Sequence, residues 1–163
     1  MRYCIREFTE ADTESVNAVA LAAFAQYSGA YTDWSAFSKN ISSMASLAKD
    51  GEIIVADTER GIIGAVVYIG PHQPKSAIFD TSWPIMRMLV VTPSARGCGV
   101  GRALAEACIA RARRDHAPLF ALHTSSIMQV ALPMYEHMGF TFLRAAPAIF
   151  GVAYGIYVKP LSP

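Results

Sequence analysis

Hydrophobic and polar side chains follow regular periods along the N-terminal half of the chain. Residues 3–8 alternate apolar and polar side chains, a pattern typical of a strand with one buried face. Thr9 and Asp12 then form a capping-box pattern that predicts the start of a helix. In that helix the apolar side chains recur at helical spacing and are expected to face the core: Val16, Val19, Ala20, Ala23, Phe24 and Tyr27.

Three more elements are predicted before residue 83. A second helix is expected over residues 34–48, where the apolar positions again recur at helical spacing. Its apolar side is formed by Phe37, Ile41, Met44 and Leu47. The apolar runs 53–56 and 62–69 flank the polar turn 57–61 and predict a β-hairpin. Residues 70–82 contain two prolines and predict a loop.

The C-terminal half continues the alternation of strands and helices. The apolar run 85–91 predicts a buried strand, and helical spacing follows over residues 100–115. Beyond them the pattern predicts a strand at 119–124, a helix that ends at Met138, and strands at 141–144 and 153–159. This order of elements, with no linker between them, favours an α/β fold.

Composition and charge restrict the class of protein. A chain of 163 residues with 53% hydrophobic content can bury one core and is too short for two ordinary domains, so we expect a single domain over residues 1–163. The net charge of +1 gives no electrostatic reason to expect nucleic acid or a membrane as partner. Cys4, Cys98 and Cys108 lack metal-ligand spacing and suit a reducing compartment. Without a signal-peptide pattern or a membrane-spanning apolar run, we expect a cytoplasmic protein with no metal site.

The stretch Arg96–Gly101 is the strongest candidate for a binding site. Its sequence, Arg-Gly-Cys-Gly-Val-Gly, places three glycines between a predicted buried strand and a predicted helix. Glycine lets the backbone approach a ligand closely, and the free N–H groups of a helix N-terminus favour an anion. The sequence therefore predicts a phosphate-binding turn.

Two common phosphate-binding loops do not fit this turn. A Walker A loop would need Lys followed by Ser or Thr after Gly101, where the chain has Arg-Ala. A dinucleotide-binding loop would need a third glycine at a spacing that neither Gly97 nor Gly99 provides. The remaining pattern, Arg/Gln-x-x-Gly-x-Gly/Ala, is filled by Arg96, Gly99 and Gly101.

A second motif lies about 35 residues further along the chain. A predicted helix ends at Gly139, and Phe140 begins the next strand. Together, Met-Leu-Val-Val-x-Pro, Arg-x-x-Gly-x-Gly and Ala-x-x-x-Tyr-Glu-x-x-Gly-Phe closely resemble, in order and separation, the GNAT superfamily of acyl-CoA-dependent N-acetyltransferases. The resemblance covers residues 85–143 in its motifs and the rest of the chain in layout.

The resemblance implies the GNAT fold, a mixed α/β sheet of about seven strands flanked by about four helices, with a splay between the two central strands. It implies acetyl-CoA as the acyl donor, and homodimers are common in the family. The residues implied at the pantetheine and acyl carbonyl are Leu89, Val90 and Val91. Those implied at the pyrophosphate are Arg96, Gly97, Cys98, Gly99, Val100, Gly101 and Arg102.

Tyr135 occupies a position at which the family often carries a general acid. A phenol with an ordinary pKa of about 10 is protonated at neutral pH and can protonate a departing thiolate. The alternative is a core tyrosine on an amphipathic helix. Two nearby positions depart from the family pattern, because Met128 stands where many members have asparagine and Pro133 lies inside the expected helix.

The resemblance does not assign the general base. Many members carry a glutamate on the strand before the glycine turn, and residues 83–87 contain no carboxylate. The candidates are His123, whose ordinary pKa is about 6.5, and Asp80, just upstream of that strand. A packed or surface histidine and a solvated loop carboxylate are the alternatives, and direct loss of the amine proton to water is a third.

Aromatic side chains gather in the segments that shape the acceptor pocket in this family. Those expected at the pocket are Tyr27, Tyr31, Trp34 and Trp83. They favour an apolar or aromatic amine, although Trp34 also fits a core position. We therefore expect transfer of an acetyl group to a primary amine of a small molecule, directly in a ternary complex. The alternatives are a protein, peptide or aminoacyl acceptor and a non-catalytic acyl-CoA sensor.

Overall fold

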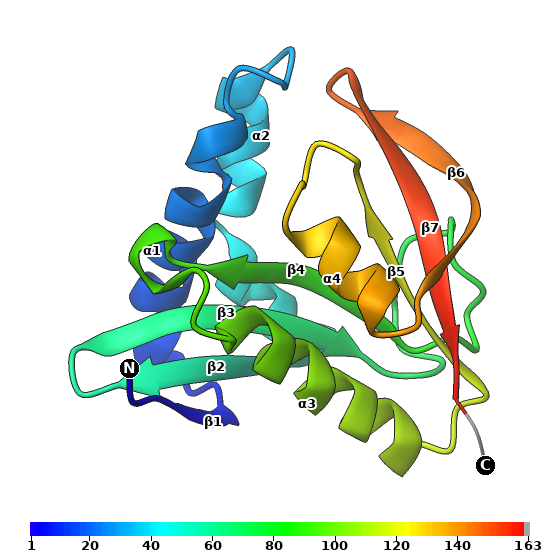
Figure 1. The fold of residues 1–163 in the computed structure, drawn as a ribbon, viewed down its shortest axis with the longest axis horizontal. Coiled ribbons are helices and arrows are strands. Elements are labelled where there is room, and N and C mark those ends of the chain that lie inside the picture. Colours follow the sequence, from blue (N-terminus) through cyan, green and yellow to red (C-terminus); the bar gives the residue numbers. More distant parts are fainter. Residues whose placement is uncertain (162–163) are drawn as a thin grey trace.

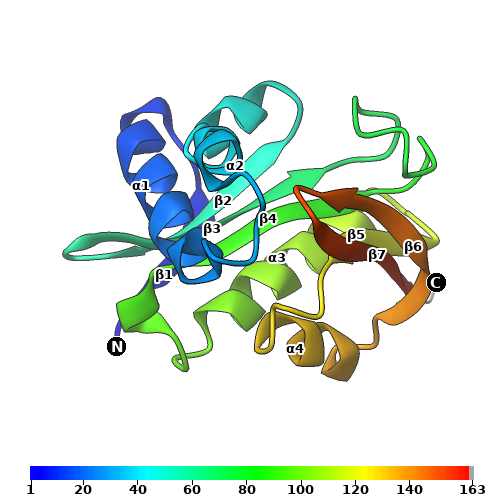
Figure 2. The same cartoon turned by 90° about the horizontal axis from the view of Figure 1, so that it is seen from above.

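A central sheet separates two layers of helices in the computed structural model, which describes residues 1–161 (Figures 1 and 2). Helices α1 (Thr13–Phe24) and α2 (Trp34–Ile41) cover one face, and α3 (Val100–Arg114) and α4 (Ala131–His137) cover the other. The strands are β1 (Cys4–Glu7), β2 (Glu52–Thr58), β3 (Gly61–Ile69), β4 (Ile85–Val91), β5 (Leu119–Thr124), β6 (Thr141–Ile149) and β7 (Val152–Pro160).

The seven strands form one mixed sheet in the order β1-β2-β3-β4-β5-β7-β6. Neighbouring strands are antiparallel except β4 and β5, which are parallel. Each face carries its own apolar core, one beneath α1 and α2 and one beneath α3 and α4. The predicted α/β architecture is therefore confirmed.

The two central strands separate soon after they meet. Within the described residues, β4 and β5 are in register only at Ile85 and Ala121. By contrast, β5 pairs with β7 along its whole length. The second half of β4 therefore has no strand partner on its β5 side, which confirms the predicted splay and leaves a gap in the middle of the sheet.

A β-bulge lies in β4 at the start of this gap. Val67 is opposite Arg87 and Ala65 is opposite Val90, so two β4 residues face one β3 residue. One of these two, Met88, has a φ of +53°, which is uncommon for a residue with a side chain. The bulge changes the alternation of β4, so that Leu89 packs in the core beneath α3.

The predicted helix over residues 34–48 is wrong as one element. Helix α2 ends at Ile41, and a separate 3₁₀ helix covers Met44–Lys49. At the break, the Ser42 and Ser43 hydroxyls donate to backbone carbonyls three residues earlier, which competes with continuation of the helix.

The predicted C-terminal strands are too short. Strand β6 continues to Ile149, and strand β7 begins at Val152 and ends at Pro160. Strand β6 accommodates Pro147 because it lies at the edge of the sheet. The α1 positions Val16, Val19 and Ala20 are buried as predicted.

Arg6 of β1 joins three segments at the opposite edge of the sheet. Its Nη1 and Nη2 donate to the two carboxylate oxygens of Asp12 at 2.8 and 3.0 Å, and its Nε donates to Asp57 at 3.0 Å. The Asp12 carboxylate also accepts from the Thr9 backbone N–H at 2.9 Å, as the capping-box pattern predicts. Because the hydrogen bond from Arg6 favours the ionised form, the pKa of Asp12 falls to about 2.

Asp12→Asn should lower the free energy of unfolding by about 1–2 kcal/mol at pH 7, because it removes a charge-assisted pair. The pKa of Asp12 is lower in the folded state than in the unfolded state. Its contribution is therefore fully present above about pH 4 and is lost as the pH falls toward 2. Urea unfolding at pH 7 and pH 2.5 checks this, with the exposed Glu59→Gln as control. An undiminished difference at pH 2.5 would contradict the assignment.

Candidate active site

The glycine turn adopts a conformation that requires glycine. Gly97 and Gly99 have φ of +79° and +80°, in the left-handed region, and Gly99 is the N-cap residue of α3. No side chain caps this helix end. The first N–H groups of α3 are therefore available to an anion, and the helix dipole favours one there.

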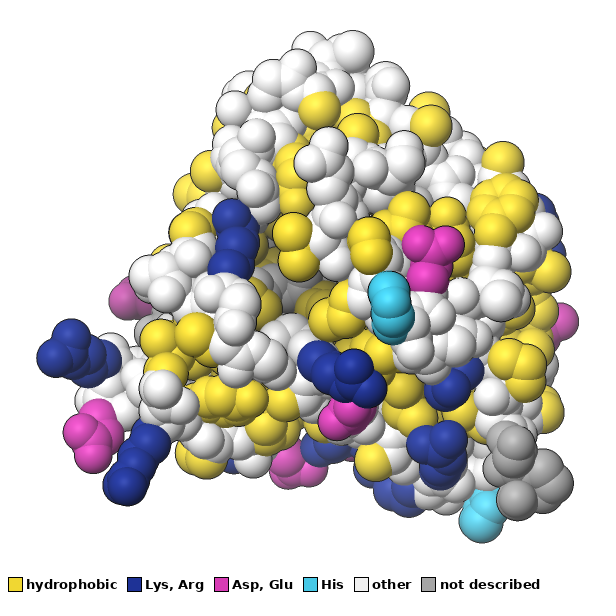
Figure 3. All heavy atoms as spheres, in the orientation of Figure 1, with side chains coloured by type: hydrophobic (Ala, Val, Ile, Leu, Met, Phe, Trp, Pro, Cys, Tyr) yellow, Lys and Arg dark blue, Asp and Glu magenta, His cyan; other side chains and the backbone are white. Residues whose placement is uncertain are grey.

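A cavity of about 490 Å³ lies against this turn, and we call it the glycine-turn cavity. It is bounded by the end of α1, the second half of β4, residues 95–102 and residues 127–134. In Figure 3 the molecule is hollowed between the α1–α2 layer and α3 and α4, with basic side chains at the rim. Among the described residues, Arg96 and Arg102 line the cavity and no carboxylate does, so its electrostatics suit a polyanion with an apolar tail.

Arg96 fastens the turn to the end of α1. Its Nη2 donates to the Ala23 carbonyl at 3.0 Å. With its amide oxygen turned toward these donors, Gln26 accepts from Arg96 Nη2 at 2.8 Å and from the Tyr27 hydroxyl at 3.1 Å. The guanidinium therefore holds two walls of the glycine-turn cavity together.

A second cavity, of about 290 Å³, lies at the other end of β4. Most of its walls are apolar and come from the α1 side of the sheet. It is lined by Ile69, Lys75, Ser76, Ile78, Phe79, Ile85, Met86, Arg87, His123, Pro147, Ala148 and Ile149. The two cavities contact β4 on either side of Met88, where the strand bulges and leaves β5.

A cavity against the glycine turn, beside a splayed β4, agrees with the comparison to known families. The family model described as Acetyltransferase (GNAT) domain matches residues 49–142, more than half of the chain. The chain belongs to the GNAT family of acetyltransferases.

Solved GNAT structures share the whole fold. A GCN5-related N-acetyltransferase from Rhodopseudomonas palustris aligns with a TM-score of 0.77 at 18% identity, covering 99% of this chain and 97% of that one. The structure described as histone acetyltransferase HPA2 and related acetyltransferase from Corynebacterium glutamicum gives 0.72 at 24% identity, with 100% and 99% covered. PaiA N-acetyltransferase from Thermoplasma acidophilum, in complex with coenzyme A, gives 0.76 at 16%, with 99% and 100% covered. No curated protein matches the chain.

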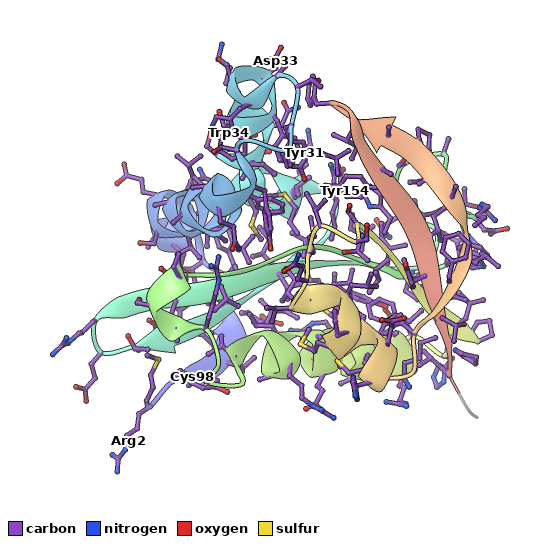
Figure 4. All side chains as sticks on the ribbon, turned by 45° about the horizontal axis from the view of Figure 1, so that its top comes forward. Arg2, Tyr31, Asp33, Trp34, Cys98 and Tyr154 are labelled. Atoms are coloured by element: carbon purple, nitrogen blue, oxygen red, sulfur yellow. The ribbon has the colours of Figure 1, made fainter. Side chains whose placement is uncertain are left out.

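Most residues implied at the cofactor in this acetyltransferase line the glycine-turn cavity. They are Leu89, Val91, Arg96, Gly97, Gly99, Val100, Gly101 and Arg102. Val90 is instead buried in the core beneath α1. Cys98 is exposed on the turn, away from Tyr31 and Trp34 in Figure 4. Met128, which departs from the family pattern, lies in the cavity wall.

Tyr135 of the acetyltransferase is buried beside the glycine-turn cavity rather than in its wall. Its ring packs edge-on against Phe140, with centroids 5.9 Å apart, whereas Ala131 and Met134 of the same helix line the cavity. Burial raises the pKa of Tyr135, so the phenol keeps its proton at neutral pH.

His123 and Asp80 lie in different surroundings. His123 lines the second cavity, where its ring lies 4.9 Å from Tyr154 and 6.0 Å from Phe79. Burial and the charge of Arg87 lower the pKa of His123 to about 4, so the imidazole is neutral at pH 7. Asp80 is exposed in the loop before β4, where its carboxylate accepts from the Ser82 N–H and hydroxyl, and it lines neither cavity.

The structure does not bring the four predicted aromatic residues into one pocket. Tyr27 lines the glycine-turn cavity. Tyr31 stacks on Phe37 at 3.9 Å and shares a hydroxyl hydrogen bond with Tyr154, and Trp34 packs beside it (Figure 4). Trp83 lies apart from them, with the Arg144 guanidinium 5.7 Å from its ring.

Sequence reasoning missed three of the residues around the second cavity. Phe79 and Ile149 come from a loop and a strand end that carry no motif. Arg87 did carry a signal, because it is a single charged residue within an otherwise apolar strand.

Among the described residues, no helix is both long and apolar enough to cross a membrane.

Nuclear magnetic resonance titration of His123 should give a midpoint near pH 4 in the wild type. Arg87→Gln should raise that midpoint, because it removes a nearby positive charge. The midpoint should stay below 6.5, because burial is the larger cause of the shift. Arg60→Gln, on the exposed β2–β3 turn, should leave the titration unchanged. A wild-type midpoint near 6.5 would mean that the imidazole is solvated.

Proposed function

We propose that this acetyltransferase moves the acetyl group of acetyl-CoA to the primary amine of a small molecule, directly in a ternary complex. The observation that carries the proposal is the pair of cavities that contact β4 on either side of its bulge. One has the features of a site for a phosphorylated donor, and the other can take an acceptor. Both are next to the gap between β4 and β5.

The glycine-turn cavity fits coenzyme A in its chemistry. The N–H groups at the start of α3 and the charges of Arg96 and Arg102 suit a pyrophosphate. The apolar side chains of Leu89, Val91 and Met134 suit the less polar pantetheine arm. The PaiA relative, whose structure contains coenzyme A, supports this choice of donor.

Acetyl-CoA would supply an acyl carbon with a thiol leaving group. In the transfer, a bond forms between the amine nitrogen and the acyl carbon, the carbon–sulfur bond breaks, and the thiolate takes a proton. Tyr135 is our candidate donor of that proton, because its phenol is protonated at neutral pH and its helix contributes Ala131 and Met134 to the cavity wall.

The amine must be neutral before it can attack. The second cavity is apolar and carries Arg87, and both features favour the neutral amine over the ammonium ion. His123, with a pKa of about 4, is a weak base at neutral pH, and the exposed Asp80 lies outside this cavity. We therefore favour loss of the amine proton to water, with His123 as an acceptor of a hydrogen bond.

The size of the second cavity supports a small acceptor. Its volume of about 290 Å³ is at the lower end of the range for small-ligand sites. A Brucella melitensis ribosomal-protein-alanine N-acetyltransferase shares the fold at 20% identity, so protein acceptors occur on this fold. A small amine agrees better with the size and the mostly apolar walls of this cavity.

Thermal unfolding should show stabilisation by acetyl-CoA and CoA but not by ATP or NAD at equal concentration. A ligand at 100 times its Kd should add about 2.7 kcal/mol. Gly99→Val should abolish this stabilisation, because a β-branched residue disfavours φ of +80° and distorts the turn. Gly61→Val, at a left-handed glycine that begins β3 and lines neither cavity, is the matched control and should keep it. If neither ligand stabilises the wild type, the proposed function is wrong.

Tyr135→Phe should keep the stabilisation by acetyl-CoA and lower kcat at least tenfold, because it removes only the phenolic proton donor. Thiol release with a turned-over amine measures kcat, and the cofactor-induced shift in Tm controls for folding. An unchanged kcat would remove Tyr135 from the mechanism and leave it as a core residue.

A further inference from the structure

The charged side chains that line the second cavity are both positive, and the nearby carboxylate of Asp80, outside the lining, interacts with Lys75. Lys75 and Arg87 line it, and no carboxylate among the described residues does. His123, the remaining titratable group in its wall, is neutral at pH 7. Arg144 adds a further positive charge next to the cavity, because its Nη2 donates to the carbonyl of the lining residue Ile78 at 2.8 Å.

The two lining cations differ in what they already bind. The Lys75 ammonium donates to the carbonyls of Gly70, Gln73 and Thr81 at 3.1, 2.9 and 3.0 Å, so its three protons hold the loop before β4 together. The Arg87 guanidinium has no hydrogen-bond or ion-pair partner within residues 1–161, and its side chain is exposed. Arg87 is therefore the cation that remains free to bind a ligand.

The side chain of Arg87, which pairs with no other described residue, lies at the second cavity. It lies on β4 between Met86 and Met88, in a strand whose other side chains are apolar. Arg87 of β4 and His123 of β5 both line the second cavity, and the charge of Arg87 contributes to the lowered pKa of the imidazole. Elsewhere in the chain, Arg6, Arg111 and Arg114 are paired with carboxylates.

We propose that the acceptor carries a carboxylate as well as its amine, and that Arg87 binds this carboxylate in the second cavity. The inference rests on the proposed function and names the substrate class. A guanidinium presents two parallel N–H groups that match the two oxygens of a carboxylate. The apolar walls, including Ile69, Phe79 and Ile85, would enclose the hydrocarbon part of the same molecule. The acceptor is thus an apolar amino acid or a similar amino carboxylate.

A carboxylate fits this site better than the other charged groups. A second ammonium group would meet Arg87 and Lys75 without a counter-charge, so diamines and polyamines are disfavoured. A guanidinium can also bind a phosphate, but the helix N-terminus that suits a phosphate lies at the other cavity.

Matched pairs of acceptors test the inference. The pairs are L-leucine with 3-methylbutylamine and 5-aminopentanoate with butylamine, in which the amine has hydrogen in place of the carboxylate. The wild type should acetylate at least one amino carboxylate with kcat/KM at least tenfold above that of its partner amine. The N-acetyl derivative of that amino carboxylate should raise the Tm of the protein. The same derivative with its carboxylate converted to a neutral carboxamide should not.

Two substitutions of Arg87 complete the test. Arg87→Gln should remove the preference, mainly through a 10- to 100-fold rise in KM, and should keep the stabilisation by CoA. Arg87→Glu should reverse the preference toward 1,5-diaminopentane. Arg60→Gln, on the exposed β2–β3 turn, controls for loss of one positive charge and should behave as the wild type.

The outcomes separate this inference from the proposed function. If CoA stabilises the protein but the partner amines are acetylated as well as the amino carboxylates, the carboxylate site is wrong and the acetyltransferase proposal stands. A preference that persists in Arg87→Gln also overturns the role of Arg87. If CoA does not stabilise the wild type, both proposals fall. If CoA binds but none of the probes is acetylated or raises the Tm, the carboxylate inference alone is overturned.

Discussion

The separation of β4 from β5 is the constraint on which the rest of the site depends. If these two parallel strands stayed in register, their backbone N–H and C=O groups would hydrogen-bond to each other and close the sheet. Here the register is limited to Ile85 and Ala121, and the sheet is open beyond them. The glycine-turn cavity has walls from both cores, from Ala23 of α1 and from Leu89 beneath α3. The cavity therefore extends from the glycine turn toward the face on which the second cavity lies.

The bulge and the charges give the two ends of β4 different chemistry. At Met88 the bulge changes which side chains of β4 point to each face of the sheet. As a result, Leu89 and Val91 line the glycine-turn cavity and Arg87 lines the second cavity. Both cavities are basic, but their cations are used differently. Arg96 is bonded to the end of α1 and stabilises a wall, whereas Arg87 has no partner within residues 1–161. A positive potential on both sides favours anionic groups on both substrates and a neutral reacting amine.

Much of the fold was predictable because its signals are local. The apolar run of β4, the glycine turn and α3 follow one another within 30 residues, and each has its own period or backbone requirement. The error over residues 34–48 has a local cause as well, since Ser42 and Ser43 bond to the preceding turn and end α2. Helical spacing alone does not reveal that competition, because the apolar side of the segment continues through Met44.

The sequence by itself determined the family, through its three motifs. It also determined the conformation of the glycine turn, because left-handed backbone at Gly97 and Gly99 and an open helix N-terminus are properties of six adjacent residues. It also singled out His123, but not its neutral state, which depends on burial and on Arg87. Only the tertiary structure decided which side chains form the second cavity. Phe79, Arg87, His123 and Ile149 belong to four segments spread over 71 positions of the chain, and no periodicity in the sequence links them. These four residues line one cavity only because the folded sheet packs their segments together, although the segments are far apart in the sequence.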